Sequence, residues 1–241
     1  MFERPFHQNI AWILGLLDST MLRENACLFG GGTAIALLYG EYRESVDMDF
    51  LVSDVTRYRY LRQQLTSSEG IASIVRKGAE PLLRAHEIRA DQYGIRTMVQ
   101  VAGQAIKFEI VLEGRMELDP PQTGDEVCGV ATLTRLDLAA SKLLANADRW
   151  NDEGVFNRGL IDLAMMQPSL PLLRRAVTKA ETAYGEAISR DLAKALEKMK
   201  QRHGWLERCM EAMAIRLPKA VVWQRLRRLN RVLHPVTIFP D

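Results

Sequence analysis

Two aspartates in an apolar stretch are the residues of this sequence best suited to chemistry. Asp47 and Asp49 flank Met48, and Phe50 begins an apolar run directly after them. Because alternate residues of a strand point to the same face, the two carboxylates should lie side by side. Neighbouring negative charges in a core strand are costly without a compensating cation. Carboxylate oxygens are ligands that Mg²⁺ prefers, so the stretch predicts a divalent metal site.

A glycine-rich turn precedes the aspartates. The residues Gly31, Gly32 and Thr33 follow a short apolar run and open a helix-forming segment that ends at a further glycine. Backbone N–H groups at such a helix start favour phosphate, and glycine allows close approach. Taken alone, the turn is more often a plain strand-to-helix connection, but its spacing from the aspartates favours nucleotide chemistry. Arg43 and Ser45, in the following loop, could contact phosphate or simply cap the strand.

A third acidic residue lies in a predicted hairpin. Alternating residues over 95–101 and 105–112, with a glycine between them, predict two antiparallel strands. Glu109 shares a face of the second strand with Lys107 and Val111. Two interpretations stay open for Glu109, either an exposed residue of an edge strand or a third carboxylate that meets the aspartates across the sheet.

The remaining pattern divides the chain into two parts. A strand is plausible over 72–76, and the polar segment 114–129, which contains Pro120 and Pro121, is interpreted as a linker. The sequence after the linker is helical throughout. Helices are predicted at 135–150, 157–167, 171–184, 186–202 and 219–233. The predicted fold class is α+β, with a mixed β-sheet flanked by helices in domain 1–130 and an all-helical domain 131–241.

Composition excludes several classes of protein. The net charge of +2 gives no global reason to expect nucleic acid, and no apolar run reaches the length of a membrane span, about 18 residues. The N-terminus lacks the pattern of a signal peptide. Three scattered cysteines argue against both disulfides and zinc. A reducing cytoplasm is therefore the expected location, with no membrane partner.

The motif around the aspartates resembles a known superfamily. Gly-Gly-Thr, then Asp-x-Asp after a fixed interval, then a distant acidic strand residue is similar to nucleotidyltransferases of the polymerase-beta type. The residue pattern is even more similar to that of the AbiEii-type toxins of type IV toxin–antitoxin systems. The matching residues are Gly31, Gly32, Thr33, Ala34, Tyr39, Gly40, Arg43, Ser45, Asp47, Asp49 and Phe50.

The second half of the chain extends the resemblance. The helix that contains Lys142 and Arg149 is similar to the family's Lys-Leu-x-Ala…Arg helix, and 158–163 is similar to its Arg/Lys-Asp-x-x-Asp-Leu segment. The resemblance implies that Lys142 binds the triphosphate and offsets charge on the leaving pyrophosphate, and that Arg149 binds phosphate or the acceptor. Asp162, nearly one helical turn after Gly159, is the candidate for the catalytic role of the family's acidic residue. The purely structural alternatives are that Lys142 lies on a solvated helix face and that Asp162 is a salt-bridge partner. One position departs from the family, since Gly159 stands where an acidic residue is usual.

The resemblance implies a function. We expect an enzyme that uses Mg²⁺ or Mn²⁺, held by Asp47, Asp49 and Glu109, to transfer a nucleoside monophosphate from an NTP to an acceptor hydroxyl with release of pyrophosphate. Glu109 would join the second ion or act as the base. The implied acceptor is the 3′ end of transfer RNA, and a cognate antitoxin is the implied protein partner. Two alternatives remain open, namely an antibiotic-type nucleotidyltransferase and, because of Gly159, a catalytically weakened nucleotide- or RNA-binding protein.

The C-terminal segment adds a basic helix. Between 212 and 240 there is no acidic residue. The basic residues there are Arg216, Lys219, Arg225, Arg227, Arg228 and Arg231. Such a helix can be an amphipathic surface helix or the electrostatic contact surface of an RNA acceptor.

Overall fold

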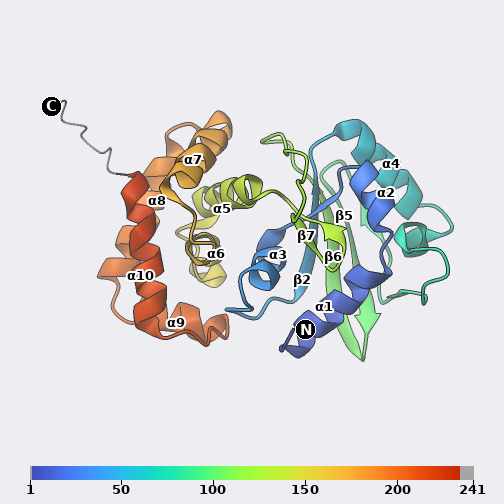
Figure 1. Cartoon of the computed structure of the whole chain (residues 1–241), viewed down its shortest axis with the longest axis horizontal. Coiled ribbons are helices and arrows are strands. Elements are labelled where there is room, and N and C mark those ends of the chain that lie inside the picture. Colours follow the sequence, from blue (N-terminus) through green and yellow to red (C-terminus); the bar gives the residue numbers. More distant parts are fainter. Residues whose placement is uncertain (1, 234–241) are drawn as a thin grey trace. The chain divides into compact units, whose positions relative to one another are not determined.

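The computed structural model describes residues 2–233 and divides the chain into two compact units, Met1–Leu138 and Ala139–Asp241. The first unit contains a mixed β-sheet with helices and the second is helical, so the predicted α+β class is confirmed (Figure 1). The predicted domain boundary at 130/131 stays a prediction. The boundary between the two compact units falls later, inside the helix α5 (Arg135–Arg149).

The sheet of the first unit has the strand order β1-β2-β6-β5-β3, with β4 also paired to β5. The central strands β2 and β6 run parallel, while β1 and β5 pair antiparallel with their neighbours. A two-stranded hairpin of β7 and β8 lies outside this sheet. The strands are β1 (Leu28–Phe29), β2 (Asp47–Val52), β3 (Leu83–Arg84), β4 (Arg89–Ala90), β5 (Gly94–Val101), β6 (Gln104–Leu112), β7 (Glu126–Val127) and β8 (Val130–Ala131).

Helices pack on this sheet and bury apolar side chains. The helices α3 and α4 pack against β2, and the aromatic rings of Phe29, Phe50 and Phe108 follow one another across β1, β2 and β6. These rings are almost completely buried and form the centre of the core. The helical elements of the first unit are α1 (Pro5–Leu16), α2 (Ser19–Glu24), α3 (Gly31–Leu38), α4 (Val55–Leu65) and the 3₁₀ helix η1 (Gly70–Ile74).

The second unit is built from helices whose apolar faces meet. The helix α6 contacts α8 and α10, and α7 contacts α8 and the 3₁₀ helix η3. Each helix buries residues at three- and four-residue intervals, as in Val222, Leu226 and Leu229 of α10. Beyond α5 the elements are η2 (Glu153–Val155), α6 (Arg158–Met165), α7 (Leu170–Tyr184), α8 (Ala187–Gln201), α9 (Trp205–Ala212), α10 (Lys219–Leu229) and η3 (Asn230–Val232). Among the described helices, none combines the length and apolar character needed to cross a bilayer.

Two local predictions are wrong. The segment 72–76 is not a strand, because most of it belongs to the 3₁₀ helix η1. The segment 114–129 is not only a linker, since β7 lies within it and pairs with β8 across the turn formed by Cys128 and Gly129. Both residues of this turn have positive φ. The hairpin of 95–101 and 105–112 is confirmed as β5 and β6.

Candidate active site

The two aspartates occupy one face of β2. Asp47 and Asp49 are half-buried, whereas Met48 and Phe50 between and after them are fully buried. This alternation confirms that both carboxylates leave the strand on the same side. In the parallel register with β6, Asp47 pairs with Lys107 and Asp49 with Glu109. The pairing brings polar residues of two strands, far apart in sequence, onto one face of the sheet.

Gly31 is the point at which the helix α3 meets the aspartate strand. Its φ of +67° lies in the left-handed region that favours glycine. A Cβ atom added at Gly31 would lie 2.2 Å from Oδ2 of Asp49, so no side chain fits there. The backbone N–H of Gly30 also donates to the carbonyl oxygen of Asp49, over 2.8 Å. The glycines therefore bring the first turn of α3 against the Asp49 carboxylate.

The loop before β2 is fixed by buried hydroxyl groups. The Thr33 hydroxyl donates to the carbonyl oxygen of Asp47 and therefore accepts from the Ser45 hydroxyl, whose oxygen lies 2.7 Å away. Arg43 is 4 % exposed and donates to the carbonyl oxygen of Glu44. Thr33, Arg43 and Ser45 thus have structural contacts around the aspartates. Their predicted role in nucleotide binding stays a prediction.

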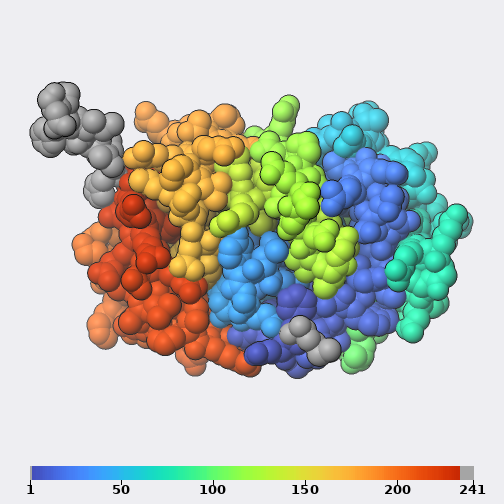
Figure 2. Space-filling view, in the orientation of Figure 1, coloured from blue at the N-terminus to red at the C-terminus, as the bar shows by residue number. Residues whose placement is uncertain are grey.

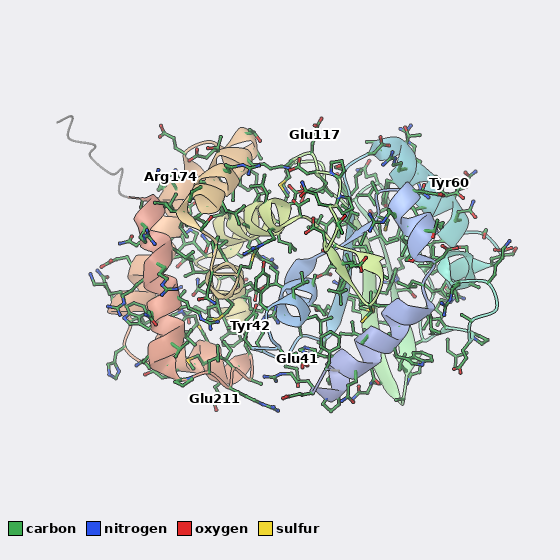
Figure 3. All side chains as sticks on the ribbon, viewed as in Figure 1. Glu41, Tyr42, Tyr60, Glu117, Arg174 and Glu211 are labelled. Atoms are coloured by element: carbon green, nitrogen blue, oxygen red, sulfur yellow. The ribbon has the colours of Figure 1, made fainter. Side chains whose placement is uncertain are left out.

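A buried histidine, His7, holds the same loop from the first helix. Its Nε2 accepts the backbone N–H of Ser45 over 3.1 Å, so its Nδ1 carries the proton and donates to Oε1 of Glu41 over 2.7 Å. Burial lowers the pKa of His7, although the Glu41 carboxylate opposes this shift. Glu41 also accepts the backbone N–H groups of Glu3 and Arg4 at the start of α1. Figure 3 labels Glu41 in the loop beside this helix.

Glu109 lies opposite Asp49 but is already held by two cations. Arg96 donates through Nε to Oε1 over 2.6 Å, and the ammonium of Lys107 pairs with Oε2. Burial would raise the pKa of Glu109, but the two cations lower it below its usual value, so the carboxylate is ionised. The structure therefore does not show Glu109 as an exposed residue of an edge strand, because β6 is central and this residue is buried.

Lys107 is a residue of the site that sequence reasoning missed. Burial would lower its pKa, but the hydrogen bond to Glu109 and the charges of Glu109, Asp49 and Asp47 raise it. Lys107 is thus a permanent cation facing both aspartates. The signal was present in the sequence, because Lys107 stands two residues before Glu109 and so shares its face. The argument that the aspartates require a metal as their compensating cation is correspondingly weaker.

The donor set still suits a divalent cation. Within residues 2–233 there is no group of three or more His, Cys, Asp or Glu side chains arranged to hold a metal ion. Asp47 and Asp49 nevertheless present oxygen ligands on one half-exposed face, which are the ligands that Mg²⁺ prefers. Magnesium usually keeps several waters and is held by one or two carboxylates together with substrate phosphates. The predicted third ligand, Glu109, stays a prediction.

The predicted residues of the second unit form an ion pair of their own. Nζ of Lys142, on α5, lies 3.3 Å from Oδ2 of Asp162, on α6, and the Asp162 side chain is 1 % exposed. Asp162 is therefore a partner that fixes the lysine. Arg149, the last residue of α5, is exposed. Binding of the triphosphate by Lys142 and Arg149 stays a prediction, as does a catalytic role for Asp162.

Gly159 allows two helices to approach closely. A Cβ atom at this position would lie 3.3 Å from the backbone nitrogen of Asn146 and 3.3 Å from the carbonyl oxygen of Lys142. Both atoms belong to the backbone of α5, which cannot move aside as a flexible side chain can. The departure from the family pattern at Gly159 therefore has a packing explanation, and it places α6 where Asp162 reaches Lys142.

Comparison with solved structures defines the class of fold. A Helicobacter pylori protein, JHP933, is similar with a TM-score of 0.56 and 15% identity, over 97% of this chain and 94% of that one. A second H. pylori structure, presented as a candidate nucleotidyltransferase, has a TM-score of 0.52 and 16% identity, over 97% and 96% of the two chains. At these identities the likeness concerns the fold alone. Among curated proteins, none matches this chain in sequence.

The family is settled by sequence. The family described as "Nucleotidyl transferase AbiEii toxin, Type IV TA system" matches residues 16–226. This match covers the aspartate strand, the glycine turn and most of the helical unit. The chain therefore belongs to the AbiEii nucleotidyltransferase family of type IV toxin–antitoxin systems.

Proposed function

We propose that this protein is a magnesium-dependent nucleotidyltransferase that moves a nucleoside monophosphate from an NTP to a hydroxyl of RNA, with the 3′ end of transfer RNA as acceptor. The observation that carries the proposal is the position of Asp47 and Asp49 on one face of β2, against the glycine turn at Gly31. Family membership supports the toxin role, and a cognate antitoxin is the proposed protein partner. The proposed location is the cytoplasm, where NTPs and transfer RNA are present.

The reaction forms one phosphorus–oxygen bond and breaks another. The acceptor oxygen attacks the α-phosphorus, the bond from that phosphorus to the bridging oxygen of the β-phosphate breaks, and pyrophosphate leaves. The hydroxyl proton passes to a carboxylate of the aspartate pair. A bound Mg²⁺, or Mn²⁺, supplies charge stabilisation at the phosphate oxygens and lowers the pKa of the acceptor hydroxyl.

The protein groups have distinct tasks in this proposal. Asp47 and Asp49 hold the metal, and the backbone N–H groups at Gly31 and Gly32 hold the triphosphate at the start of α3. Lys107 adds positive charge beside the aspartates, and Glu109 keeps that lysine in place. Because Glu109 is ionised and paired with two cations, we assign it to orientation of Lys107 as well as to the metal.

The cations of the helical unit complete the proposal. Lys142 and Arg149 are proposed to neutralise the triphosphate and the leaving pyrophosphate. Asp162 then acts as a positioning residue, because its buried carboxylate fixes the ammonium of Lys142. This assignment keeps all three predicted residues in the reaction and gives Asp162 an indirect part.

A labelling assay tests the proposed function. Purified protein is incubated with each α-³²P-labelled NTP, Mg²⁺ and total RNA, and label is expected in transfer RNA. Asp47→Asn, which removes a metal ligand with little change of shape, should reduce labelling by at least about a thousandfold. Asp54→Asn is the matched control, because the exposed Asp54 caps α4 directly after β2 and asparagine caps helices equally well.

Other outcomes of this assay would favour the alternatives. Label transferred to an aminoglycoside or lincosamide, with RNA unlabelled, would indicate an antibiotic-type enzyme. Nucleotide binding with no transfer to any acceptor would indicate a catalytically weakened binding protein. Labelling of RNA that persists in Asp47→Asn would contradict the assignment of the metal site.

A further inference from the structure

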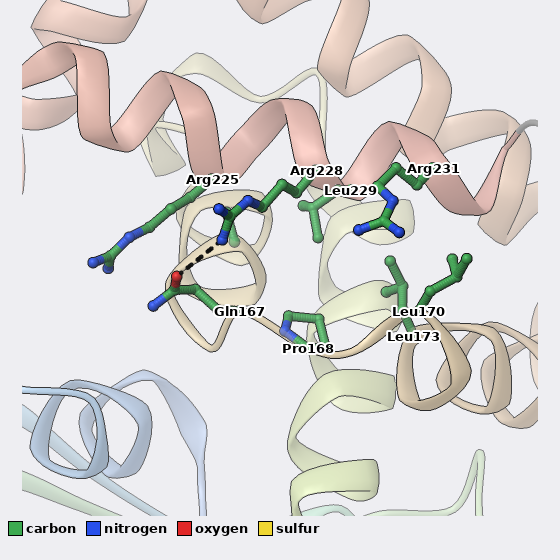
Figure 4. A pocket seen from close by; sticks show the side chains of 9 residues that line it. Gln167, Pro168, Leu170, Leu173, Arg225, Arg228, Leu229 and Arg231 are labelled. Carbon is green, nitrogen blue, oxygen red and sulfur yellow. Dashed lines mark hydrogen bonds between the residues drawn. The ribbon is translucent and has the colours of Figure 1, made fainter.

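A hollow of about 200 Å³ lies in the helical unit, and none of the residues that line it has a part in the proposed reaction. It is bounded by the end of α6, the start of α7 and the C-terminal part of α10 with η3. Arg225, Arg228 and Arg231 form one side, and Leu170, Leu173, Leu229, Pro168 and Gln167 are among the residues that form the rest (Figure 4). The hollow therefore combines three cationic groups with an apolar base.

The three arginines share one side of α10 and its extension. They follow one another at intervals of three residues, which places them on neighbouring turns of one face. No carboxylate pairs with any of them within the described part of the chain, residues 2–233. Like charges on neighbouring turns of a helix repel one another. Binding of an anion would relieve this repulsion.

The side chains are also partly held in position. Arg228 donates to Oε1 of Gln167 over 3.4 Å, and Arg225 lies 3.1 Å from the sulfur of Met165. Figure 4 shows the guanidinium groups of Arg228 and Arg231 directed toward the connection between α6 and α7. A guanidinium group binds a phosphate group through two parallel hydrogen bonds. Arginine side chains therefore favour phosphate over anions that cannot accept two such bonds.

We propose that this hollow binds backbone phosphates of the RNA acceptor. The row of three arginines spans roughly 9 Å along the helix axis, which is longer than one phosphate group and suits a run of them. The apolar base formed by Pro168 and the leucines offers contact to a ribose or base between those phosphates. The helix α10 lies at the molecular surface (Figure 2). Because it carries further exposed cations and has no acidic residue, the surface around the hollow also favours a polyanion.

The inference rests on the proposed function only for the identity of the acceptor. RNA binding is measured by fluorescence anisotropy with fluorescein-labelled bulk transfer RNA, at several salt concentrations. Arg228→Gln/Arg231→Gln removes two arginines of the hollow. The matched control, Arg216→Gln/Arg227→Gln, removes the same charge from positions that do not line the hollow. Thermal unfolding checks that both variants remain folded.

The proposal predicts different effects for the two variants. The hollow variant should weaken RNA binding about tenfold, and the control should weaken it less than about threefold. The slope of log Kd against log salt should fall by about 0.7 to 0.9 for each phosphate that the variant no longer binds, and only in the hollow variant. Equal weakening in both variants, or no weakening in the hollow variant, overturns the proposal.

Two further probes distinguish other anions. Inorganic phosphate and polyglutamate are tested for binding to the same variants. Dependence of either probe on Arg228 and Arg231, together with unchanged RNA affinity, overturns the RNA assignment. If the wild-type protein transfers no nucleotide but its RNA binding depends on the hollow, the proposed function fails and this inference stands. If transfer occurs and RNA binding is insensitive to the hollow variant, the inference alone fails.

Discussion

At the scale of single residues, His7 shows how a buried side chain controls the loop that leads into the aspartate strand. The backbone N–H of Ser45 can only donate, so Nε2 of His7 must be unprotonated. Protonation of the ring would therefore remove this hydrogen bond. Glu41 would stabilise the added charge, whereas burial and the nearby Arg4 and Arg43 oppose it. The lowered pKa of His7 shows that burial and the two arginines outweigh Glu41.

This arrangement predicts how stability depends on pH. The pKa of His7 in the folded protein is below its ordinary value of 6.5, so the unfolded chain binds a proton at a higher pH than the folded protein does. The free energy of unfolding should therefore fall as the pH drops below about 6.5, by up to about 1.4 kcal/mol per pH unit from this group. Urea unfolding at a series of pH values between 7.5 and 5 measures this change in the free energy of unfolding.

The control for this prediction is His7→Gln. An amide side chain can donate to Glu41 and accept from Ser45 but does not titrate. Its stability should change less between pH 7.5 and 5 than that of the wild type. An identical pH dependence in the two proteins would show that titration of His7 does not contribute to the pH dependence of stability.

At the scale of elements, the contact between α5 and α6 depends on Gly159. Alanine normally stabilises a helix relative to glycine by about 1 kcal/mol. At Gly159 the new methyl group would press against the backbone of α5, and overpacking costs about 1–3 kcal/mol. We therefore expect Gly159→Ala to lower the free energy of unfolding by about 1 kcal/mol, measured by urea unfolding. Gly159→Asp should also fail to raise activity.

A second helical glycine provides the comparison. Gly15 lies in α1, is exposed, and has nothing within 4 Å of an added Cβ atom. Gly15→Ala should raise the free energy of unfolding by about 0.5–1 kcal/mol. If Gly159→Ala stabilises the protein as much as Gly15→Ala does, the close packing of α6 on α5 is not what requires glycine.

The elements also show what the sequence can and cannot predict. Strict alternation made the hairpin of β5 and β6 predictable, together with the shared face of Asp47 and Asp49. The parallel pairing of β2 with β6 joins segments far apart in the chain, so no local pattern contains it. The helix α9 was missed because it is short and begins directly after Gly204, and a glycine at that position suggested a break. Lys107 was missed because a lysine in a strand is ordinarily a solvated surface residue.

At the scale of the whole molecule, the two proposals assign metal binding to the sheet-containing unit, and neutralisation of the triphosphate together with RNA retention to separate parts of the helical unit. The candidate metal ligands all lie before Leu138, and the arginine hollow lies entirely after it. A variant of the arginine hollow should therefore change mainly KM for RNA, and a variant of the metal ligands should change mainly kcat. Uniform binding energy removed from a remote site raises KM, whereas loss of a group that acts only in the transition state lowers kcat.

Steady-state kinetics with transfer RNA as the varied substrate measures this separation. Arg228→Gln/Arg231→Gln should raise KM for RNA about tenfold and leave kcat within about twofold, because the reacting groups are intact. Asp47→Asn should lower kcat by at least about a thousandfold while its Kd for RNA stays unchanged. A large fall in kcat in the arginine variant at saturating RNA would mean that the hollow takes part in the transition state, and its assignment to RNA retention alone would be wrong.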